Sequence, residues 1–188
     1  MEKVKIGRLL FHDKILSANR NIACATCHSQ DLGGSDGLSL GIGEGGHGIG
    51  LERTAGSGDD KIKKRIPRNA LALWNLGFKD ITTLLHDGRV TKSDIFGNGF
   101  NTTAQELLPK GLDNIVAVQA LFPMTRQFEM AGNPGENEII GLVSKVGKDS
   151  MRIDRVWPVI THRIRGVPEY VEMFKHCLLY TSPSPRDS

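Results

Sequence analysis

The pentapeptide Cys24-Ala25-Thr26-Cys27-His28 constrains this chain more than any other feature of its sequence. Two cysteines three positions apart lie on one side of a helical turn, so both thiols can form thioether bonds to the vinyl groups of one haem. The adjacent His28 offers an imidazole nitrogen to the haem iron. The spacing therefore predicts a c-type haem site, with Cys24 and Cys27 as the attachment points and His28 as the proximal ligand.

Cysteine pairs at this spacing also occur in redox disulfides and in zinc sites. A thioredoxin-like motif sits in a βαβ pattern, and a zinc site needs a second pair of Cys or His ligands. This sequence has neither feature, because its third cysteine is Cys177 and its other histidines form no close H-x3-5-H pair. Haem attachment is therefore the favoured interpretation.

The two ends of the chain are expected to carry no site. Residues 177–188, CLLYTSPSPRDS, do not continue the amphipathic pattern of Pro168–Lys175 and resemble the translation of a sequencing-library adapter. We therefore expect the native sequence to end near His176, residues 177–188 to be an artefactual tail, and Cys177 to have no function; a natural Ser/Pro-rich disordered tail is the alternative. Met1 opens directly into a helical segment without a signal peptide, although haem attachment outside the cytoplasmic membrane implies export.

Composition excludes several classes of protein. A chain of 188 residues with 39% apolar and 24% charged residues suits a globular domain with a buried core. No apolar run reaches the length of a membrane span. The basic cluster Lys61–Arg65 lies between Gly and Asp residues and is typical of a solvated turn, so no nucleic-acid partner is expected.

Local patterns predict a mainly α fold interrupted by long loops. Glycine is concentrated between Gly33 and Gly58, a segment that cannot hold a regular helix or strand and is expected to wrap the cofactor. No alternating polar and apolar strands are visible. Apolar periodicity and capping signals predict helices over Val4–Phe11, Arg68–Leu76, from a capping box at Thr103–Glu106, over Asn114–Leu121 with Asp113 as the cap, over Ile139–Val146, and from Pro168.

Further residues around the haem motif occur in an order shared with a known family. They are Gly7–Phe11 with Asp13 and Leu16-Ser17, Cys24–His28, Gly33-Gly34 with Asp36, Pro67–Asn69, Asp87–Arg89, Gln119 with Pro123 and Glu129-Met130, and Val167–Tyr170 with Phe174. In this order and spacing the chain resembles the bacterial di-haem cytochrome c peroxidase family, which includes the tryptophan-modifying di-haem enzymes of methylamine utilisation. The resemblance implies a cytochrome c-like haem domain, mainly α, with long Gly-rich loops.

The resemblance also implies an organisation and an activity. Members have two cytochrome c-type domains with one haem each; the amino-terminal haem reacts with hydrogen peroxide, and the other takes electrons from a small cytochrome c or cupredoxin. This sequence has a single C-x-x-C-H motif, so residues 1–176 are expected to be the amino-terminal, peroxidatic domain, truncated before the second haem domain. The expected function is periplasmic reduction of hydrogen peroxide to water, with a homodimer as a candidate assembly.

The family pattern assigns roles to three further residues. Glu129 and Gln119, with Pro123 between them, match the two distal-pocket residues: Glu129 as the acid/base that moves a peroxide proton, and Gln119 as a hydrogen-bond donor that orients peroxide. Without the family, a surface glutamate and a helix-face glutamine are the simpler interpretations. Asn69 matches a position whose amide oxygen helps bind calcium between the domains, with a helix cap as its alternative.

Two positions depart from the family pattern. Ile42 stands where many members have a loop histidine on the sixth iron position, so His47 is a candidate distal ligand and a five-coordinate iron is the alternative. His86 replaces a tryptophan that precedes Asp-Gly-Arg between the haems, while Trp74 is expected in the core. Enlarged segments at residues 45–65 and 92–110 leave the subfamily open.

Two other functions remain open on the sequence. A di-haem oxidase that modifies a protein or small-molecule substrate would use Gln119 and Glu129 equally well. A monohaem electron carrier without catalysis needs a permanent sixth ligand, for which Met124 and Met130 are candidates. Methionines at such spacing more often fill a core.

Overall fold

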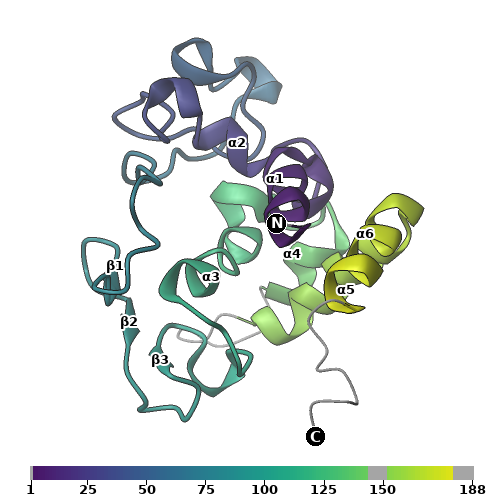
Figure 1. The fold of residues 1–188 in the computed structure, drawn as a ribbon. Helices are drawn as coiled ribbons and strands as arrows, with labels where there is room; N and C mark the ends of the chain where they lie inside the picture. Colours follow the sequence, from purple (N-terminus) through teal and green to yellow (C-terminus); the bar gives the residue numbers. More distant parts are fainter. Residues whose placement is uncertain (1, 144–151, 180–188) are drawn as a thin grey trace, which may run out of the picture.

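The computed structural model describes residues 2–143 and 152–179. Its helices are α1 (Glu2–His12), α2 (Cys24–Cys27), α3 (Ile115–Gln119), α4 (Glu138–Val143), α5 (Ile153–Arg165) and α6 (Pro168–Leu179), with a π-helical turn, η7 (Gln127–Ala131), before α4 (Figure 1). Short 3-10 turns are η1 (Lys14–Leu16), η2 (Gln30–Leu32), η3 (Gly50–Glu52), η4 (Gly58–Asp60), η5 (Gln105–Leu107) and η6 (Pro123–Thr125). The fold is mostly helical with long loops, as predicted. Within these residues no helix has both the length and the apolar character needed to cross a bilayer.

A small antiparallel sheet lies between the Gly-rich segment and α3. Its strands are β1 (Thr83–Leu84), β2 (Val90–Lys92) and β3 (Phe100–Asn101), in the order β1-β2-β3. Leu84 pairs with Val90, and Lys92 pairs with Phe100. These strands leave no alternating pattern in the sequence, because strands of two or three residues are too short to show one.

The larger core lies where α1, α4, α5 and α6 meet. Val156, Ile160 and Ile164 of α5 are buried at helical spacing and face this core. The first and last described helices, α1 and α6, pack against each other (Figure 1). Cys24 and Cys27 pack against the same cluster, so the haem motif rests on the larger core.

A second core lies beneath the sheet and α3. Its buried members are Leu84, Val90, Phe100, Ala104, Leu108, Ile115, Val118, Phe122 and Ile153. Trp157 of α5 packs against both cores, and its indole Nε1 donates to the carbonyl of Leu121 at 3.1 Å. One tryptophan thus joins the sheet to the helices that support the haem motif.

The predicted helix at Arg68–Leu76 does not form. Leu71, Leu73 and Trp74 are 38%, 38% and 54% exposed, so no buried face stabilises a helix there. A helix this short is marginal without tertiary packing. The expectation that Trp74 lies in the core is wrong for the same reason; its indole lies instead against Gly34, where an added Cβ would be 3.4 Å from Nε1.

Several predicted helix ends are displaced. Asn114, not Asp113, caps α3, because its Oδ1 accepts from the backbone N–H of Ala117 at 2.9 Å. The capping box expected at Thr103–Glu106 is wrong: η5 starts at Gln105, and the hydroxyl of Thr102 accepts from the N–H of Ala104 at 3.1 Å. Local propensity placed these turns correctly to within two residues.

The carboxy-terminal helices form largely as predicted. α4 covers the start of the helix expected from Ile139, and Val146 lies outside the described residues. α6 begins at Pro168 as predicted but runs to Leu179, so the expected end of its pattern before Cys177 is wrong. Cys177 is 6% exposed. The rest of the expected tail, residues 180–188, lies outside the described part of the chain.

Candidate haem site

The haem motif forms a single helical turn. Cys24 and Cys27 begin and end α2, both are partly buried, and neither is in a disulfide. The hydroxyl of Thr26 accepts from the N–H of Ala23 at 3.1 Å, and the N–H of His28 donates to the carbonyl of Cys24 at 3.0 Å. The two thiols and the imidazole therefore come from one preformed turn, as the spacing predicts.

The imidazole of His28 is oriented by a backbone carbonyl. Its Nδ1 lies 3.0 Å from the carbonyl oxygen of Gly34, which can only accept, so Nδ1 carries the proton and Nε2 keeps its lone pair for a metal. Hydrogen bonds from Gly34 N to Ser29 O (2.8 Å) and from Ser29 N to Ser35 O (2.9 Å) close this turn. Gly34 has φ +76°, and a Cβ there would lie 2.8 Å from the backbone nitrogen of Leu73, so only glycine fits.

The state of the thiols separates haem attachment from its alternatives. Burial raises the pKa of Cys27 to about 11 and also raises that of Cys24. A redox disulfide motif needs the opposite, a lowered thiol pKa. In the described ranges no three His, Cys, Asp or Glu side chains gather as a metal site, which leaves zinc without ligands. Protonated thiols beside an oriented imidazole fit a covalently attached haem.

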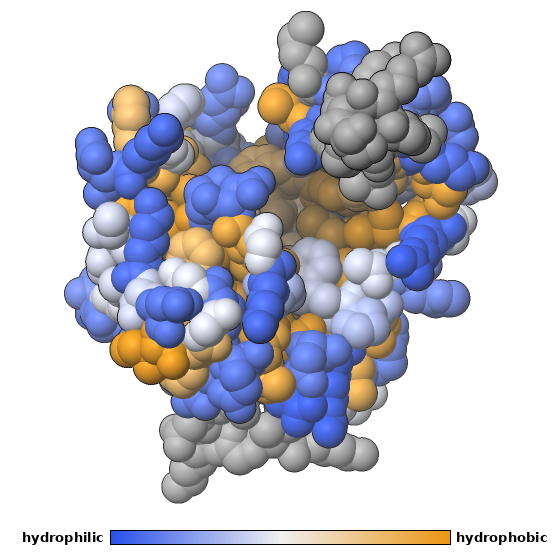
Figure 2. All heavy atoms as spheres, turned by 60° about the horizontal axis from the view of Figure 1, so that its bottom comes forward, coloured by the Kyte–Doolittle hydropathy of each residue, from blue (hydrophilic) through white to orange (hydrophobic). Residues whose placement is uncertain are grey.

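One face of the molecule is hollowed. Figure 2 shows a hollow whose walls are largely hydrophobic, bordered by hydrophilic side chains. Cofactor sites are typically concave and apolar with a few placed polar groups. The donor set of the α2 turn fits a haem, with Cys24 and Cys27 as tethers and His28 as the iron ligand.

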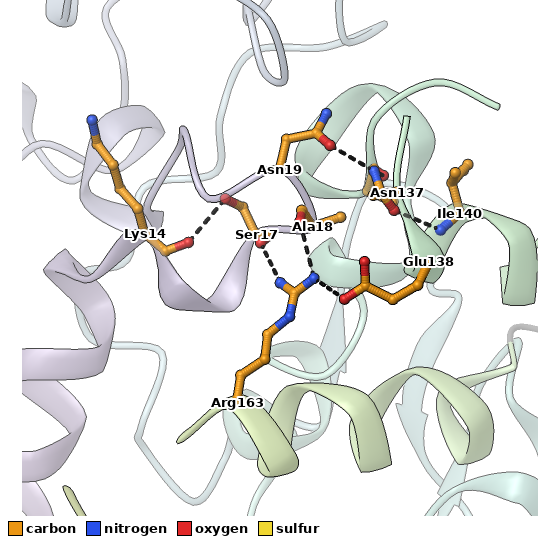
Figure 3. Close-up of polar contacts among 9 residues, drawn as sticks. Lys14, Ser17, Ala18, Asn19, Asn137, Glu138, Ile140 and Arg163 are labelled. Atoms are coloured by element: carbon orange, nitrogen blue, oxygen red, sulfur yellow. Dashed lines mark hydrogen bonds and ion pairs between the residues drawn. The ribbon is translucent and has the colours of Figure 1, made fainter. Parts of the chain in front are cut away.

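A buried arginine holds the turn that leads into α2. Arg163 of α5 donates from Nη1 to the carbonyl of Ser17 at 2.9 Å and from Nη2 to that of Ala18 at 3.1 Å, and it also pairs with Glu138 of α4 (Figure 3). The hydrogen bond from Arg163 lowers the pKa of Glu138. The N–H of Ala18 donates to the carbonyl of Met130 at 2.8 Å, so η7 also contacts this turn.

Asparagines join the same turn to the Gly-rich loop. Asn137 donates to Asn19 Oδ1 at 2.8 Å, and its own Oδ1 accepts from the N–H of Ile140 at 2.9 Å in the first turn of α4 (Figure 3). Asn19 and Asn21 both donate to Glu44 Oε1, at 2.8 Å and 2.6 Å. Glu44 is therefore fixed to the segment that precedes the haem motif.

The Gly-rich loop folds around Arg53, which is only 6% exposed. Its Nε donates to the carbonyl of Ile42 at 2.5 Å, Nη1 to that of Gly48 at 2.7 Å and Nη2 to that of Gly43 at 2.6 Å. The thiol of Cys27 lies 3.8 Å from the same Ile42 carbonyl, and Ile42 itself is fully buried. The predicted loop is therefore present next to the haem motif.

Sequence reasoning did not single out Arg53. A lone arginine in a glycine-rich segment has the pattern of a solvated surface residue. One feature could have indicated its role: a loop without secondary structure has many backbone carbonyls that need hydrogen-bond donors, and arginine has five N–H donors.

Glu129 lies on η7, directly against the Gly-rich loop. An added Cβ on Gly43 would be 2.1 Å from the carbonyl oxygen of Phe128 and 3.0 Å from Glu129 Cα, so the two backbones touch. The N–H of Glu44 donates to the Phe128 carbonyl at 3.1 Å. π-Helical turns are rare and occur mostly at functional sites. The structure thus brings Glu129 to the loop that contacts Cys27.

The electrostatics of Glu129 suit a proton carrier. Burial raises its pKa, and the nearby charges of Arg126 and Arg89 oppose that shift. The carboxylate also contributes to the raised pKa of Cys27, so the two groups are within electrostatic range of each other. A buried carboxyl with a raised pKa is a better proton acceptor than an exposed one and can return the proton it accepts.

Gln119 is the last residue of α3, and its Oε1 is buried without a hydrogen-bond partner. An unpaired buried amide oxygen costs about 1–3 kcal/mol, which suits a side chain that faces a ligand or water. No hydrogen bond links Gln119 to Glu129, both of which are described. The role of Gln119 in orienting peroxide stays a prediction.

His47 lies on the outer part of the Gly-rich loop. It is paired by backbone hydrogen bonds with Thr54, and its Nε2 is 2.7 Å from Asp60 Oδ2. The side chain is 53% exposed. This contact occupies one ring nitrogen, and the distal-ligand role of His47 stays a prediction.

Asn69 is exposed and donates from Nδ2 to the hydroxyl of Ser35 at 3.0 Å. The alternative of a helix cap is wrong, because no helix follows it. Its hydrogen bond uses the amide nitrogen, whereas calcium binds oxygen. The calcium role stays a prediction.

Both methionines considered as iron ligands lie in the larger core. Met124 is 2% exposed and Met130 is 4% exposed. They pack there with Ile139 and Val156, which agrees with a core-filling role.

The whole chain can now be compared with known proteins. Residues 1–184 match the family described as di-haem cytochrome c peroxidase. The chain belongs to this family. Its membership confirms the resemblance drawn from the residues around the haem motif, and with it the haem-domain fold.

Individual relatives in the di-haem cytochrome c peroxidase family match short segments. The methylamine utilization protein MauG of Methylorubrum extorquens is 50% identical over 44 residues, 23% of this chain and 12% of that protein. The cytochrome c peroxidase Ccp of Escherichia coli is 49% identical over 45 residues, 24% of this chain and 10% of that protein. MauG of Methylophilus methylotrophus is 50% identical over 40 residues, 21% and 12% of the two chains. The matched segments thus span about a tenth of these relatives.

Proposed function

We propose that this chain is the peroxide-reacting haem domain of a periplasmic di-haem enzyme. The enzyme reduces hydrogen peroxide to water, taking two electrons and two protons for each peroxide. A small cytochrome c or a cupredoxin supplies the electrons through a second haem domain. His28 is the proximal iron ligand, Cys24 and Cys27 hold the haem, and Glu129 and Gln119 act on peroxide.

The placement of Glu129 is the observation that carries this proposal. Its backbone packs on Gly43, the neighbouring Ile42 carbonyl faces the thiol of Cys27, and burial raises the pKa of its carboxyl. An acid/base held by a rigid loop beside the haem tether is the arrangement that peroxide cleavage requires. An electron carrier has no use for such a group.

The haem, when bound, supplies a Lewis-acidic iron and the electrons that cleave the O–O bond. Glu129 in its ionised form would accept a proton from one oxygen of peroxide. It then returns this proton to the departing oxygen, which leaves as water. The Gln119 amide donates a hydrogen bond that holds peroxide in line with Glu129. The charges of Arg126 and Arg89 favour the ionised form of Glu129 and so oppose the rise in its pKa that burial causes.

The test is the reaction of the haem-loaded chain with peroxide, followed by stopped-flow absorption of the haem bands. We expect Glu129→Gln to slow this reaction about 100-fold or more, because positioned acid/base groups contribute roughly that much. Glu106→Gln, an exposed carboxyl on η5, is the matched control and should react like the wild type. A low-spin protein with a sulfur-to-iron absorption band and no response to peroxide would instead establish an electron carrier.

A second candidate is a di-haem oxidase that uses peroxide to modify a protein or small molecule. Two MauG proteins match this chain at about the same identity as the peroxidase, and this similarity supports the oxidase as a second candidate. In that enzyme Glu129 and Gln119 have the same tasks. Steady turnover of peroxide with a reduced small cytochrome by the whole di-haem protein would support the peroxidase and exclude the oxidase as its main activity.

A further inference from the structure

We propose that Arg53 is a positioning residue, which fixes the loop of residues 42–48 between the haem tether Cys27 and the backbone of Glu129. This inference rests on the proposed function, because the distance between haem and acid/base matters only if Glu129 acts on a haem ligand. It adds a residue to that site which the family resemblance does not supply.

The loop has no helix or strand that would hold it in place. Its backbone carbonyls therefore need donors from elsewhere. Arg53 donates to the carbonyls of Ile42, Gly43 and Gly48, at 2.5, 2.6 and 2.7 Å. The fixed fork of a guanidinium can reach such divergent acceptors, whereas a lysine ammonium is a single point.

The contacts on either side of the loop connect the two parts of the site. On one side, the Ile42 carbonyl accepts from Arg53 and lies 3.8 Å from the Cys27 thiol. On the other side, Gly43 touches the backbone of Phe128 and Glu129. Gly43 and Ile42 are adjacent, so any movement of this segment changes both contacts together.

The loop is packed without slack around the guanidinium. An added Cβ on Gly46 would lie 2.3 Å from Ile42 Cγ2 and 2.9 Å from Arg53 Nη2. Interiors packed this closely transmit a displacement instead of absorbing it. A movement of Arg53 would therefore displace the loop relative to both Cys27 and Glu129.

The charge of Arg53 is buried without a direct ion pair. Among the described residues its guanidinium bonds to backbone carbonyls, while the carboxyls of Asp36 and Glu44, 0% and 8% exposed, offset its charge at longer range. Burial of a charge is costly unless it is compensated. An arginine whose role was only to keep the surface soluble would lie exposed to solvent, whereas Arg53 is buried.

The first test measures how firmly the loop is held. Amide hydrogen exchange of peptides covering residues 42–54 is compared in the haem-loaded wild type, Arg53→Met and Arg53→Lys. We expect exchange about tenfold or more faster in Arg53→Met, because each lost hydrogen bond to a charged donor is worth about that factor, with Arg53→Lys intermediate. Arg152→Lys is the control: it replaces a guanidinium that pairs with Asp154 and not with the loop, and it should leave exchange in this loop unchanged.

The second test asks whether the loop positions Glu129. The charged groups that act on Glu129 are Arg126 and Arg89, since Cys27 is a thioether in the haem-loaded chain. Release of the loop admits water to Glu129, which weakens the effect of burial and lowers the pKa of its carboxyl. The acid limb of the pH–rate profile for the peroxide reaction should therefore move to lower pH in both Arg53 variants. A purely structural role would reduce the folded fraction and leave that limb in place.

The outcomes separate the two proposals. Faster loop exchange together with a shifted acid limb supports the positioning role. Unchanged loop exchange overturns it, and faster exchange with an unshifted limb overturns the link to Glu129. If Arg53→Met does not fold, Arg53→Lys serves for both measurements. If the wild type does not react with peroxide at all, the proposed function fails, while the exchange data still decide whether Arg53 holds the loop.

Discussion

Replacement of Gly43 by alanine tests the contact between the Gly-rich loop and η7. The new Cβ would start 2.1 Å from the Phe128 carbonyl oxygen, and real Cβ atoms stay at 3.0 Å or more, so the two backbones must separate by about 0.9 Å. Overpacking of this kind costs about 1–3 kcal/mol. The separation also breaks the hydrogen bond from Glu44 N to Phe128 O, worth about 1 kcal/mol. We expect Gly43→Ala to lower the free energy of unfolding by about 2–4 kcal/mol in total.

The assay is thermal unfolding of the haem-loaded chain, followed by circular dichroism. For a chain of this size a loss of that magnitude lowers Tm by roughly 10 °C. Gly7→Ala is the matched control, because Gly7 is exposed within α1 and nothing lies within 4 Å of an added Cβ. Alanine there should raise stability by about 0.5–1 kcal/mol. A Gly43→Ala protein with a Tm within about 2 °C of the wild type would refute the contact described between loop and π-helical turn.

Two further predictions concern protonation. In the folded, haem-free chain, burial raises the pKa of Cys27 from 9.0 to about 11, which lowers the fraction of thiolate at pH 8. Cys27 should therefore react with iodoacetamide at pH 8 roughly 100-fold more slowly in the folded chain than in urea. Equal rates would contradict the burial of the thiol. Arg163 holds the pKa of Glu138 below its ordinary value of 4.5, so this pair stabilises the fold above that pH and loses its effect as pH falls through the lowered pKa. Denaturant unfolding should therefore show a stability difference between wild type and Glu138→Gln at pH 7 that shrinks toward pH 3, and a constant difference would exclude the linkage.

Local sequence patterns were sufficient for the elements whose stabilising groups are close in sequence. The turn of α2 and the capped start of α3 depend on residues within four positions of each other, and both form at or beside the predicted place. The helix expected at Arg68–Leu76 has the right residues but no partner surface, and exposure of Leu71 and Trp74 shows that tertiary packing decided its absence. Propensity cannot supply that information.

Some residues of the candidate site can also be predicted from local sequence, whereas others depend on tertiary contacts. His28, Cys24 and Cys27 follow from spacing alone. The burial of Glu129 depends on Gly43 and on the extra residue of a π-helical turn, neither of which leaves a periodic pattern. Arg53 was missed because its acceptors meet only after the loop has closed. For Glu129 the family resemblance supplied what local chemistry could not.

The clamp of Arg163 on Ser17 sets an order of events during biogenesis. These two residues are 146 positions apart, so the segment around Cys24 is held only once the exported chain has folded across that distance. Contacts across such separations form late in folding. Until then both thiols are solvated, with ordinary acidity and room for a ligase to reach them. We therefore expect the two thiols to be most open to haem attachment before α5 docks, and the docking of Arg163 to fix the turn before α2 afterwards.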